Sequence, residues 1–292
     1  MAAELKFASD LNSLLGSCLK STSYEVKRVV ELFHSNCKKF SKQLGDGTIE
    51  KIVVEEIDGK GFCSVIFKIK LAFNNGKDDV AHYFTLIAKV CSDQKWNDLV
   101  DEESRFDPEK SKQLIQHIHN CECDAYELLQ QIKNIPVPEI YYLEKADSKN
   151  MGVILMEDVS LFGRSMDDSE SVTKEQCFEI ARILADFQAQ IHFLEDQSWR
   201  SKFFLNPATC DIVDIGTNSM MSQVLNIEDE ELRSYIKTFY EMDKKKLAKF
   251  ALEDFTDQFG VNTLAHGDLW SNNLFFKCNQ DGTVSNEVAF HY

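Results

Sequence analysis

The chain has 292 residues, of which 43% are hydrophobic and 27% charged, a composition typical of a globular protein that buries a core. Its formal net charge of −16 would repel a phosphate backbone, which argues against nucleic-acid binding through a broad basic face. The sequence holds no apolar run long enough to span a membrane, and its few glycines and prolines argue against long disorder.

Cysteine content and the N-terminal residues bear on the compartment. The nine cysteines have no regular spacing and no C-x-x-C pair, which predicts reduced thiols rather than a disulfide framework. The N-terminal residues place a glutamate early and no basic region before an apolar core, so they do not predict a signal peptide. We therefore expect a cytoplasmic protein without a membrane partner.

The first half of the chain reads as a helical segment followed by strands. Residues 1–45 are predicted to be helical and amphipathic. The next segments are rich in β-branched and aromatic residues and are separated by turn signals, which predicts an antiparallel meander because short turns join neighbouring strands. These predicted strands cover residues 48–57, 61–73 and 80–91.

A helix is predicted next, over residues of about 110–133, where apolar side chains recur at three- and four-residue steps. Two further extended segments follow it. Prolines at the start of the first of these segments indicate an edge or an entry to the sheet. The two segments cover residues 135–144 and 152–158.

The second half of the chain is predicted to be mainly helical. Thr173 and Gln176 have the spacing of a capping box and would begin a helix over residues 174–193. More helical segments are predicted over residues of about 226–258. A mainly β half followed by a mainly α half predicts two lobes joined near residues 157–161, with a small-molecule site in the cleft between them.

The stretch HIHNCEC within the predicted helix offers an alternative interpretation as a zinc site. It places His117, His119, Cys121 and Cys123 at alternate positions, and on a strand all four side chains would share one face. On a helix, residues two apart point to nearly opposite sides. The helical period of the surrounding sequence therefore favours a helix over a metal site.

Two charged residues in the first half interrupt apolar patterns. Lys89 is the one charge in the strand segment YFTLIAKVC, and Glu122 falls on the apolar stripe of the predicted helix. An unpaired buried ammonium is costly, so we expect Lys89 to meet an anion, and Glu122 is the economical partner. Gly59 and Gly61 in the hairpin DGKGFCS would let backbone amides approach a phosphate beside this pair.

The segment HGDLWSNNLFF has the features of a catalytic loop. Asp268 and Asn273 are five residues apart, the interval between the base and the metal-binding amide of the kinase catalytic loop. A carboxylate at the first position can accept the proton of a hydroxyl, while the amide oxygen at the second holds a magnesium ion. We expect His266, Trp270 and Phe275 to pack and anchor the loop.

With these residues collected, the chain resembles the CHK kinase-like family, also called ecdysteroid-kinase-like, of the protein-kinase-like superfamily, to which choline and aminoglycoside kinases are related. HGDLWSNNLFF is similar to the catalytic loop of that family, and HNCECDAYELL is similar to its helix with the ion-pair glutamate. The resemblance covers residues of roughly 30–290. Its most specific part is the catalytic loop.

The resemblance implies an α+β fold of the protein-kinase-like, two-lobe type. Its N-lobe would be an antiparallel β-sheet with one key helix, and its C-lobe would be mainly α-helical and, in this chain, incomplete. The implied organisation is an N-terminal helical segment, an N-lobe and a C-lobe. These regions cover residues 1–45, 46–158 and 159–292.

The resemblance also implies ATP-dependent phosphorylation of a hydroxyl on a small molecule, with magnesium, and family substrates include steroid alcohols. Asp268 would be the catalytic base and Asn273 a magnesium ligand. Lys89 would contact the phosphates, and Glu122 would hold Lys89 in place. The nucleotide-binding set implied as a whole is Gly59, Gly61, Ser64, Lys89, Glu122, Met156, Glu157 and Asp158.

The sequence departs from the pattern of such kinases at its C-terminal end. They use a second metal-binding aspartate on the strand after the catalytic loop. Here NEVAFHY begins that strand without an aspartate, and Asp281 belongs to the preceding QDGT turn. We therefore expect weak or absent catalysis by this chain, and apolar surface near NEVAFHY that aggregates or binds a protein partner.

Two functional interpretations follow. The first is a small-molecule kinase or a shortened form of one, and the second is a non-catalytic nucleotide-binding or regulatory pseudokinase. A globular α+β protein with coincidental motifs is a third interpretation, disfavoured because so many parts occur in order.

Overall fold

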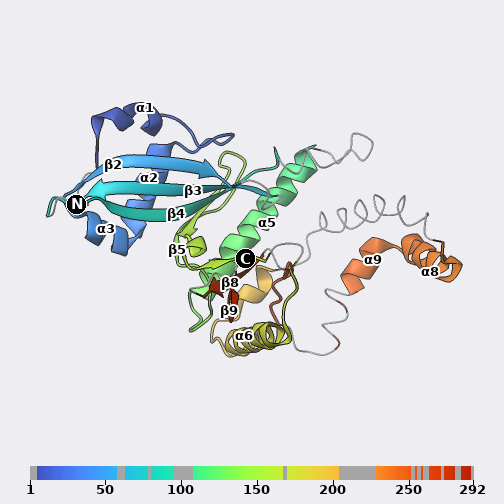
Figure 1. The fold of residues 1–292 in the computed structure, drawn as a ribbon. Coiled ribbons are helices and arrows are strands. Elements are labelled where there is room, and N and C mark those ends of the chain that lie inside the picture. The colour runs from blue at the N-terminus through green and yellow to red at the C-terminus, as the bar shows by residue number, and fades with distance from the viewer. Residues whose placement is uncertain are drawn as a thin grey trace.

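The structure is a computed structural model that describes residues 5–57, 63–77, 80–94, 108–166, 170–203, 228–250, 254, 258, 263–270, 273–279 and 284–290. A large sheet with helices α1, α2 and α3 forms one part, and helix α5 leads from it towards a second part with α6, β8 and β9 (Figure 1). Helices α8 and α9 stand apart from both parts.

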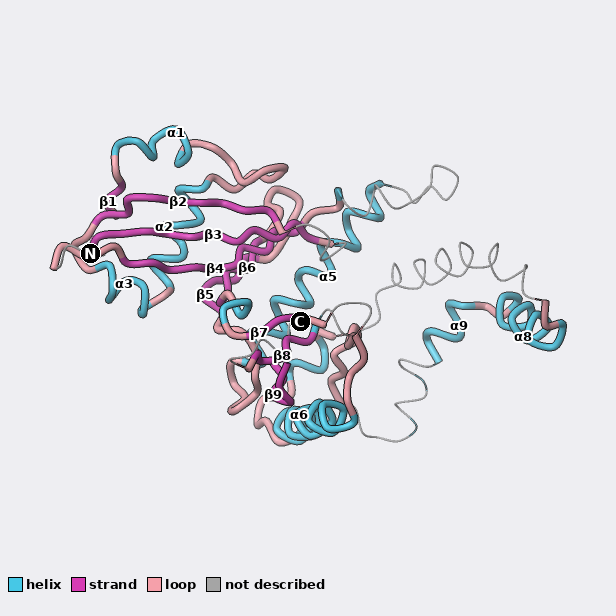
Figure 2. The backbone as a smooth tube through the Cα atoms, viewed as in Figure 1, coloured by secondary structure: helices cyan, strands magenta, loops and turns pink. Residues whose placement is uncertain are grey.

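The larger sheet has six strands in the order β1-β2-β3-β4-β6-β5. All its pairs are antiparallel except β1 with β2, which is parallel. The tube in Figure 2 follows β2, β3 and β4 as long neighbouring strands. Its strands are β1 (Lys6–Phe7), β2 (Thr48–Glu56), β3 (Ser64–Asn74), β4 (His82–Cys91), β5 (Ile140–Glu144) and β6 (Val153–Glu157).

Side-chain alternation gives this sheet two different faces. On β3 every second residue from Val65 to Phe73 is buried, as expected for a strand with one face in a core. This face packs against the N-terminal helices, where Phe33 and Phe40 stack with ring centroids 4.9 Å apart. The helical elements on this side are η1 (Ser9–Leu11), α1 (Asn12–Leu15), α2 (Val26–Asn36) and α3 (Lys38–Leu44).

The opposite face of the sheet meets α5 and the second part of the chain. Its apolar residues, Ile87, Ile154 and Met156 among them, form a separate core cluster with α5 and α6. A small sheet in the order β7-β8-β9 lies beside α6. The elements are α5 (Pro108–Leu129), η3 (Val159–Leu161), β7 (Gly163–Arg164), α6 (Lys174–His192), η4 (Ser198–Ser201), α8 (Glu230–Glu241), α9 (Lys244–Lys249), β8 (Leu274–Cys278) and β9 (Val284–Phe290).

The α+β class is confirmed, and so are the antiparallel meander and the long helix between its third strand and the next strands. The short parallel strand β1 was not predicted, and neither was β7, which pairs with β8 more than a hundred residues away. None of the described helices is long and apolar enough to cross a bilayer. The cysteines that the structure describes are free thiols: Cys18, Cys37, Cys63, Cys91, Cys121, Cys123, Cys177 and Cys278.

The predicted capping box is confirmed at the start of α6. The Gln176 amide N–H donates to the Thr173 hydroxyl at 3.2 Å, and the Thr173 N–H donates to Gln176 Oε1 at 2.8 Å. Gln176 Nε2 also donates to the Ser285 carbonyl at 3.0 Å, which ties the helix to β9. The side chain is only 1% exposed, so each of these groups depends on its partner.

We expect Gln176→Ala to lower the free energy of unfolding by about 2 kcal/mol, because it leaves the Thr173 N–H and the Ser285 carbonyl without their partner. Lys174→Ala, at an exposed position two residues earlier in the same helix, should change the free energy of unfolding by less than about 0.5 kcal/mol. Urea unfolding followed by circular dichroism measures both. Equal effects of the two variants would contradict this account of the helix start.

Candidate active site

A cavity of about 510 Å³ lies between the second face of the large sheet, helix α5 and the segment that leads into β8. Its volume is in the range of roughly 300–1,000 Å³ that holds small ligands. It brings together residues of the two halves of the chain. Among its lining residues are Ser64, Ile66, Ile87, Lys89, His117, Cys121, Glu122, Met156, Glu157, Asp158, Asp268, Trp270 and Asn273.

Strand register places Lys89 on the cavity side of the sheet. Residues directly opposite each other in antiparallel strands point to the same side. Lys89 lies opposite Ile66 on β3 and Ile154 on β6, whereas its neighbour Ala88 lies opposite Phe67, which faces the other core. The ammonium of Lys89, on the otherwise apolar strand β4, therefore faces the cavity.

The predicted ion pair between Lys89 and Glu122 is confirmed. Lys89 Nζ lies 2.6 Å from Glu122 Oε1, and the two side chains are only 15% and 10% exposed. Burial raises the pKa of Glu122, while the charge and hydrogen bond of Lys89 oppose that rise. The carboxylate therefore depends on Lys89 to remain charged, and it fixes the ammonium in the cavity wall in return.

The segment from residue 263 to residue 273 holds Asp268 and Asn273 together. Asn273 Nδ2 donates to Asp268 Oδ2 at 2.9 Å and to the Asp268 carbonyl at 2.8 Å. Because both contacts use the amide nitrogen, the amide oxygen points away from Asp268. That oxygen is the atom that a hard cation would use.

The turn that presents Asp268 is built by the two residues before it. Gly267 has φ +83°, in the left-handed region that favours glycine. The Asp268 backbone N–H donates to His266 Nδ1 at 3.3 Å, so the ring accepts at this nitrogen. His266 thus packs and orders the loop, as predicted. Trp270 differs from the prediction, since it is 46% exposed and lines the cavity mouth instead of anchoring the loop in a core.

The C-terminal end of β6 and the start of β3 border the cavity. Met156 is buried among the apolar residues of the cavity face. The Glu157 carboxylate binds the backbone just before β5, since its Oε2 accepts a hydrogen bond from the Glu139 N–H at 3.2 Å. Ser64 is also buried and lines the cavity at the start of β3. Gly59 and Gly61 lie outside the described residues.

Asp158 engages a lysine that the sequence did not single out. Its Oδ2 lies 2.8 Å from Lys68 Nζ, and the same ammonium donates to Ser160 Oγ at 2.8 Å. Ser160 donates to Asp158 Oδ1 through its hydroxyl at 2.5 Å and its backbone N–H at 3.2 Å. We call Lys68, Asp158 and Ser160 the hinge clasp, because they tie strand β3 to the segment that leads into the second half.

The hinge clasp keeps a carboxylate charged in a buried place. Asp158 is 1% exposed, and burial, the largest influence, raises the pKa of Asp158. The hydrogen bonds from Lys68 and Ser160 and the positive charge of Lys68 outweigh burial, so the pKa of Asp158 lies below its ordinary value. The carboxylate of Asp158 thus serves the connection between β3 and the segment after β6.

The loop before β8 holds the candidate oxygen ligands for a metal. Among the described residues, no group of three or more histidine, cysteine, aspartate or glutamate side chains is arranged to hold a metal ion. The described part of β9 contains Glu287, whose carboxylate is 2.9 Å from Lys277 Nζ on an exposed surface. Asp281 lies outside the described residues, so Asp268 and Asn273 are the candidate oxygen donors in view.

The comparison with known families extends over most of the chain. The family described as uncharacterized oxidoreductase dhs-27 (DUF1679) matches residues 38–289. The chain belongs to this family. Among solved structures, it is similar to a GDP complex of a mutant aminoglycoside 2'-phosphotransferase-IIIa, with 14% sequence identity and a TM-score of 0.42, over 91% of this chain and 73% of that one.

The hinge clasp gives a prediction for stability. Lys68→Met should lower the free energy of unfolding by about 3 kcal/mol at neutral pH, because it leaves the Asp158 carboxylate buried without its cation. Lys70→Met is the matched control. Lys70 lies on the same strand and face, but its partner Glu55 and Lys70 itself are about half exposed, so we expect a change of no more than about 1 kcal/mol.

The pH dependence has a definite sign. The folded pKa of Asp158 is lowered, so its contribution is fully present above the unfolded value of about 4 and is lost as pH falls through the folded pKa. The difference between the wild type and Lys68→Met should therefore shrink on acidification. Thermal unfolding at a series of pH values tests this, and a difference that does not change with pH would contradict it.

Proposed function

We propose that this protein is an ATP-dependent phosphotransferase that phosphorylates a hydroxyl group of a small alcohol. The observation that carries the proposal is that the buried Lys89–Glu122 ion pair and the hydrogen-bonded Asp268–Asn273 pair line one cavity. The first pair offers a positioned ammonium, and the second offers a carboxylate and an amide oxygen. Phosphoryl transfer depends mainly on such positioning and charge stabilisation.

The donor set fits ATP and magnesium. Mg²⁺ prefers oxygen ligands, and the amide oxygen of Asn273, which points away from Asp268, offers one. Phosphate oxygens need a fixed cation, which Lys89 supplies. When bound, ATP would provide the phosphoryl group and Mg²⁺ would neutralise its charge.

Each residue then has a distinct role in the proposed reaction. Asp268 accepts the proton of the acceptor hydroxyl, and Asn273 holds the metal. Lys89 binds phosphate oxygens, and Glu122 orients Lys89. The nucleotide-binding roles of Ser64 and of residues 156–158 are part of the same proposal, with Met156 providing an apolar surface for the base.

The finer assignment within this proposal is a CHK kinase-like enzyme, whose family substrates include steroid alcohols. Support for an acceptor with an apolar body comes from the cavity wall, which includes Phe203, Leu264 and Trp270. An alcohol of this kind would bury apolar surface and present one hydroxyl to Asp268. A protein partner at the C-terminal edge stays a prediction.

A second candidate function is oxidoreduction, because the description of the matching family names an oxidoreductase. An enzyme of this class that uses a nicotinamide dinucleotide commonly binds it on a parallel sheet with a glycine-rich turn. In the described part of this chain, the pairs from β2 through β5 are antiparallel, and the cavity holds an ion pair suited to phosphate. The site chemistry therefore favours phosphoryl transfer.

A ligand panel distinguishes the candidates. Calorimetric titration with ATP, NADH and NADPH, each with and without magnesium, should show binding of ATP. Turnover is followed as ADP formation with a set of alcohols that includes steroids. Binding of NADH or NADPH instead of ATP would favour the oxidoreductase, and ATP binding without turnover of any alcohol would favour the non-catalytic alternative.

Asp268→Asn should lower the rate of phosphoryl transfer by about 10²- to 10⁴-fold, because the amide cannot accept the hydroxyl proton. Nucleotide affinity should change little. Asp186→Asn on the exposed face of α6 removes an equal charge from a residue that does not line the cavity, and it is the matched control. A variant of Asp268 that keeps most of its turnover would reassign this loop to a structural role.

Lys89→Met should weaken ATP binding about tenfold or more, since a charge-assisted contact to phosphate is lost. Adenosine, which has no phosphate, should bind the variant and the wild type with similar affinity. Lys277→Met, at an exposed position of β8, is the control for loss of a positive charge. Equal loss of ATP and adenosine binding would show that the variant damages the cavity as a whole.

A further inference from the structure

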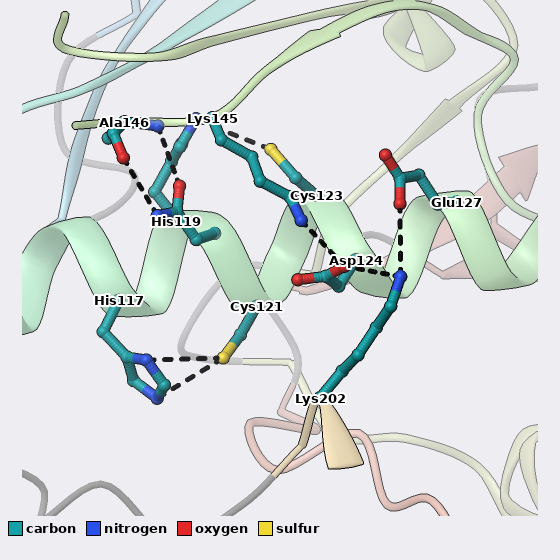
Figure 3. A network of polar contacts seen from close by, with 10 residues as sticks. His117, His119, Cys121, Cys123, Asp124, Glu127, Lys145, Ala146 and Lys202 are labelled. Carbon is teal, nitrogen blue, oxygen red and sulfur yellow. Dashed lines mark hydrogen bonds and ion pairs between the residues drawn. The ribbon is translucent and has the colours of Figure 1, made fainter. Parts of the chain in front are cut away.

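Helix α5 carries a carboxylate that is paired with one lysine from each half of the chain (Figure 3). Asp124 Oδ1 lies 2.8 Å from Nζ of Lys145, which follows strand β5, and 2.9 Å from Nζ of Lys202, which follows η4. Lys202 Nζ also lies 3.5 Å from Glu127 Oε2. One carboxylate oxygen thus joins the first half of the chain to the second through two ammonium groups.

Opposite sides of α5 are used by the two kinds of ion pair. Glu122 and Asp124 are two residues apart, so their side chains point to nearly opposite sides of the helix. Glu122 pairs with Lys89 and lines the cavity, whereas Asp124 is not among the lining residues. Figure 3 shows Lys202 reaching the helix from the second half of the chain, with Asp124 and Glu127 turned towards its ammonium. The helix is therefore held by the sheet on one side and by the second half on the other.

The short turn η4 explains how Lys202 meets the helix while the next residue meets the cavity. Trp199 is buried in the core cluster that includes Cys123 and Tyr126 of α5. Side chains three residues apart in a 3₁₀ turn lie on the same side, so Lys202 faces α5 as Trp199 does, and its N–H donates to the Trp199 carbonyl at 2.9 Å. Phe203 comes next, packs against the same cluster and lines the cavity.

The two lysines differ in what else ties their segments to α5. The chain beside Lys145 is also held by Asn120 of the helix, which exchanges two hydrogen bonds of 2.8 and 3.0 Å with the backbone of Ala146. Of the described residues 198–203, Lys202 is the one whose side chain forms ion pairs with α5. Loss of the Lys202 ammonium should therefore loosen its segment, whereas loss of the Lys145 ammonium should leave its segment in place.

We propose that Asp124 is a positioning residue, which holds Lys202 and thereby places Phe203 in the cavity wall, where its ring sets the affinity for the apolar body of an acceptor. The Asp124 side chain is 13% exposed, and its charge is kept by its partners. Burial raises the pKa of Asp124, but the hydrogen bonds from Lys145 and Lys202 outweigh burial and hold the pKa below its ordinary value. The carboxylate is therefore ionised at neutral pH and can hold both lysines.

The size of the effect follows from the exposure of the lysine. Lys202 is 43% exposed, and an ion pair with a half-exposed partner changes an equilibrium constant by about two- to fivefold. A change of that size suits a residue that adjusts the cavity wall without deciding whether the chain folds. The acceptor role of Phe203 rests on the proposed function, whereas the hold of Asp124 on Lys202 does not.

Hydrogen exchange of the full chain, followed by mass spectrometry of the peptide that covers residues 198–203, tests the positioning directly. Lys202→Met should speed exchange there about two- to fivefold, because the segment leaves α5 more often. Lys145→Met is the matched control, since it removes an ammonium of similar exposure, 45% against 43%, from the same carboxylate oxygen. Lys202→Arg keeps the charge and should exchange as the wild type does. Unchanged exchange in Lys202→Met, or equal acceleration by both methionine variants, would overturn the proposal.

Equilibrium binding of two probes tests the effect on the cavity wall. Testosterone has an apolar body and one hydroxyl, and adenosine reports on the nucleotide part of the cavity. Lys202→Met should weaken testosterone binding about two- to fivefold and leave adenosine binding unchanged, whereas Lys145→Met should change neither. General damage to the fold would weaken both probes alike. Absence of testosterone binding in the wild type, or equal weakening by the two variants, would refute the role in acceptor binding.

A double-mutant cycle shows whether Lys202 acts through Phe203. In the Phe203→Ala background, Lys202→Met should no longer change testosterone affinity, because the ring that it positions is gone. An undiminished effect in that background would contradict the proposal. Turnover is measured separately as ADP formation, so that the two proposals fail independently. The expected testosterone response without any ADP formation would leave the positioning role standing and refute the proposed kinase function.

Discussion

A lysine ammonium inside an apolar sheet needs an anion, and this need organises the cavity. Lys89 points from β4 to the face that meets α5, where its Nζ lies 2.6 Å from Glu122 Oε1. Removal of either charge would leave the other buried without compensation, which is far more costly than loss of an exposed pair. The position of α5 against the sheet is therefore fixed electrostatically as well as by the packing of Cys123 and Tyr126 in the core.

Two lysines on the same face of the sheet each pair with a buried carboxylate, and the two ion pairs have different roles. Lys68 lies opposite Ile87, on the face that also carries Lys89. Its ammonium bonds to Asp158 and Ser160 and ties the sheet to the hinge. Lys89 lines the cavity itself. One ion pair thus holds the connection between the two halves, while the other presents a charge to whatever enters between them.

The sequence was sufficient to find Lys89 and Glu122 because each charge interrupts an apolar pattern with a known period. Lys68 escaped notice because it alternates with apolar residues as a solvent-facing lysine does, and Lys70 beside it is such a lysine. Only the path of the segment after β6, which brings Asp158 over β3, separates the two. The short strands β1 and β7 could not be predicted either, because each is formed by pairing with a segment that is distant in the sequence.

The helical period of the sequence also predicted correctly that the histidines and cysteines of HIHNCEC lie on different sides of a helix, but it did not predict their surroundings. It separated His117 and Cys121 from His119 and Cys123, as the structure confirms. It could not tell that His119 and Cys123 are the buried pair, because that depends on how α5 is rotated against β5 and β6. His119 is covered by the Glu144 carbonyl and Gly152, which are contributed by the β5 end and the chain before β6.

The description of the family and the chemistry of the site point to different reactions, and the site is the stronger guide. A fold or a family name is compatible with several activities, whereas buried charges are kept only where something compensates their desolvation. Here the compensated charges are an ammonium with its carboxylate, and beside them lies an exposed carboxylate whose amide partner turns its oxygen outward. A hydride acceptor requires none of these groups, whereas the proposed transfer of a phosphoryl group would use each of them.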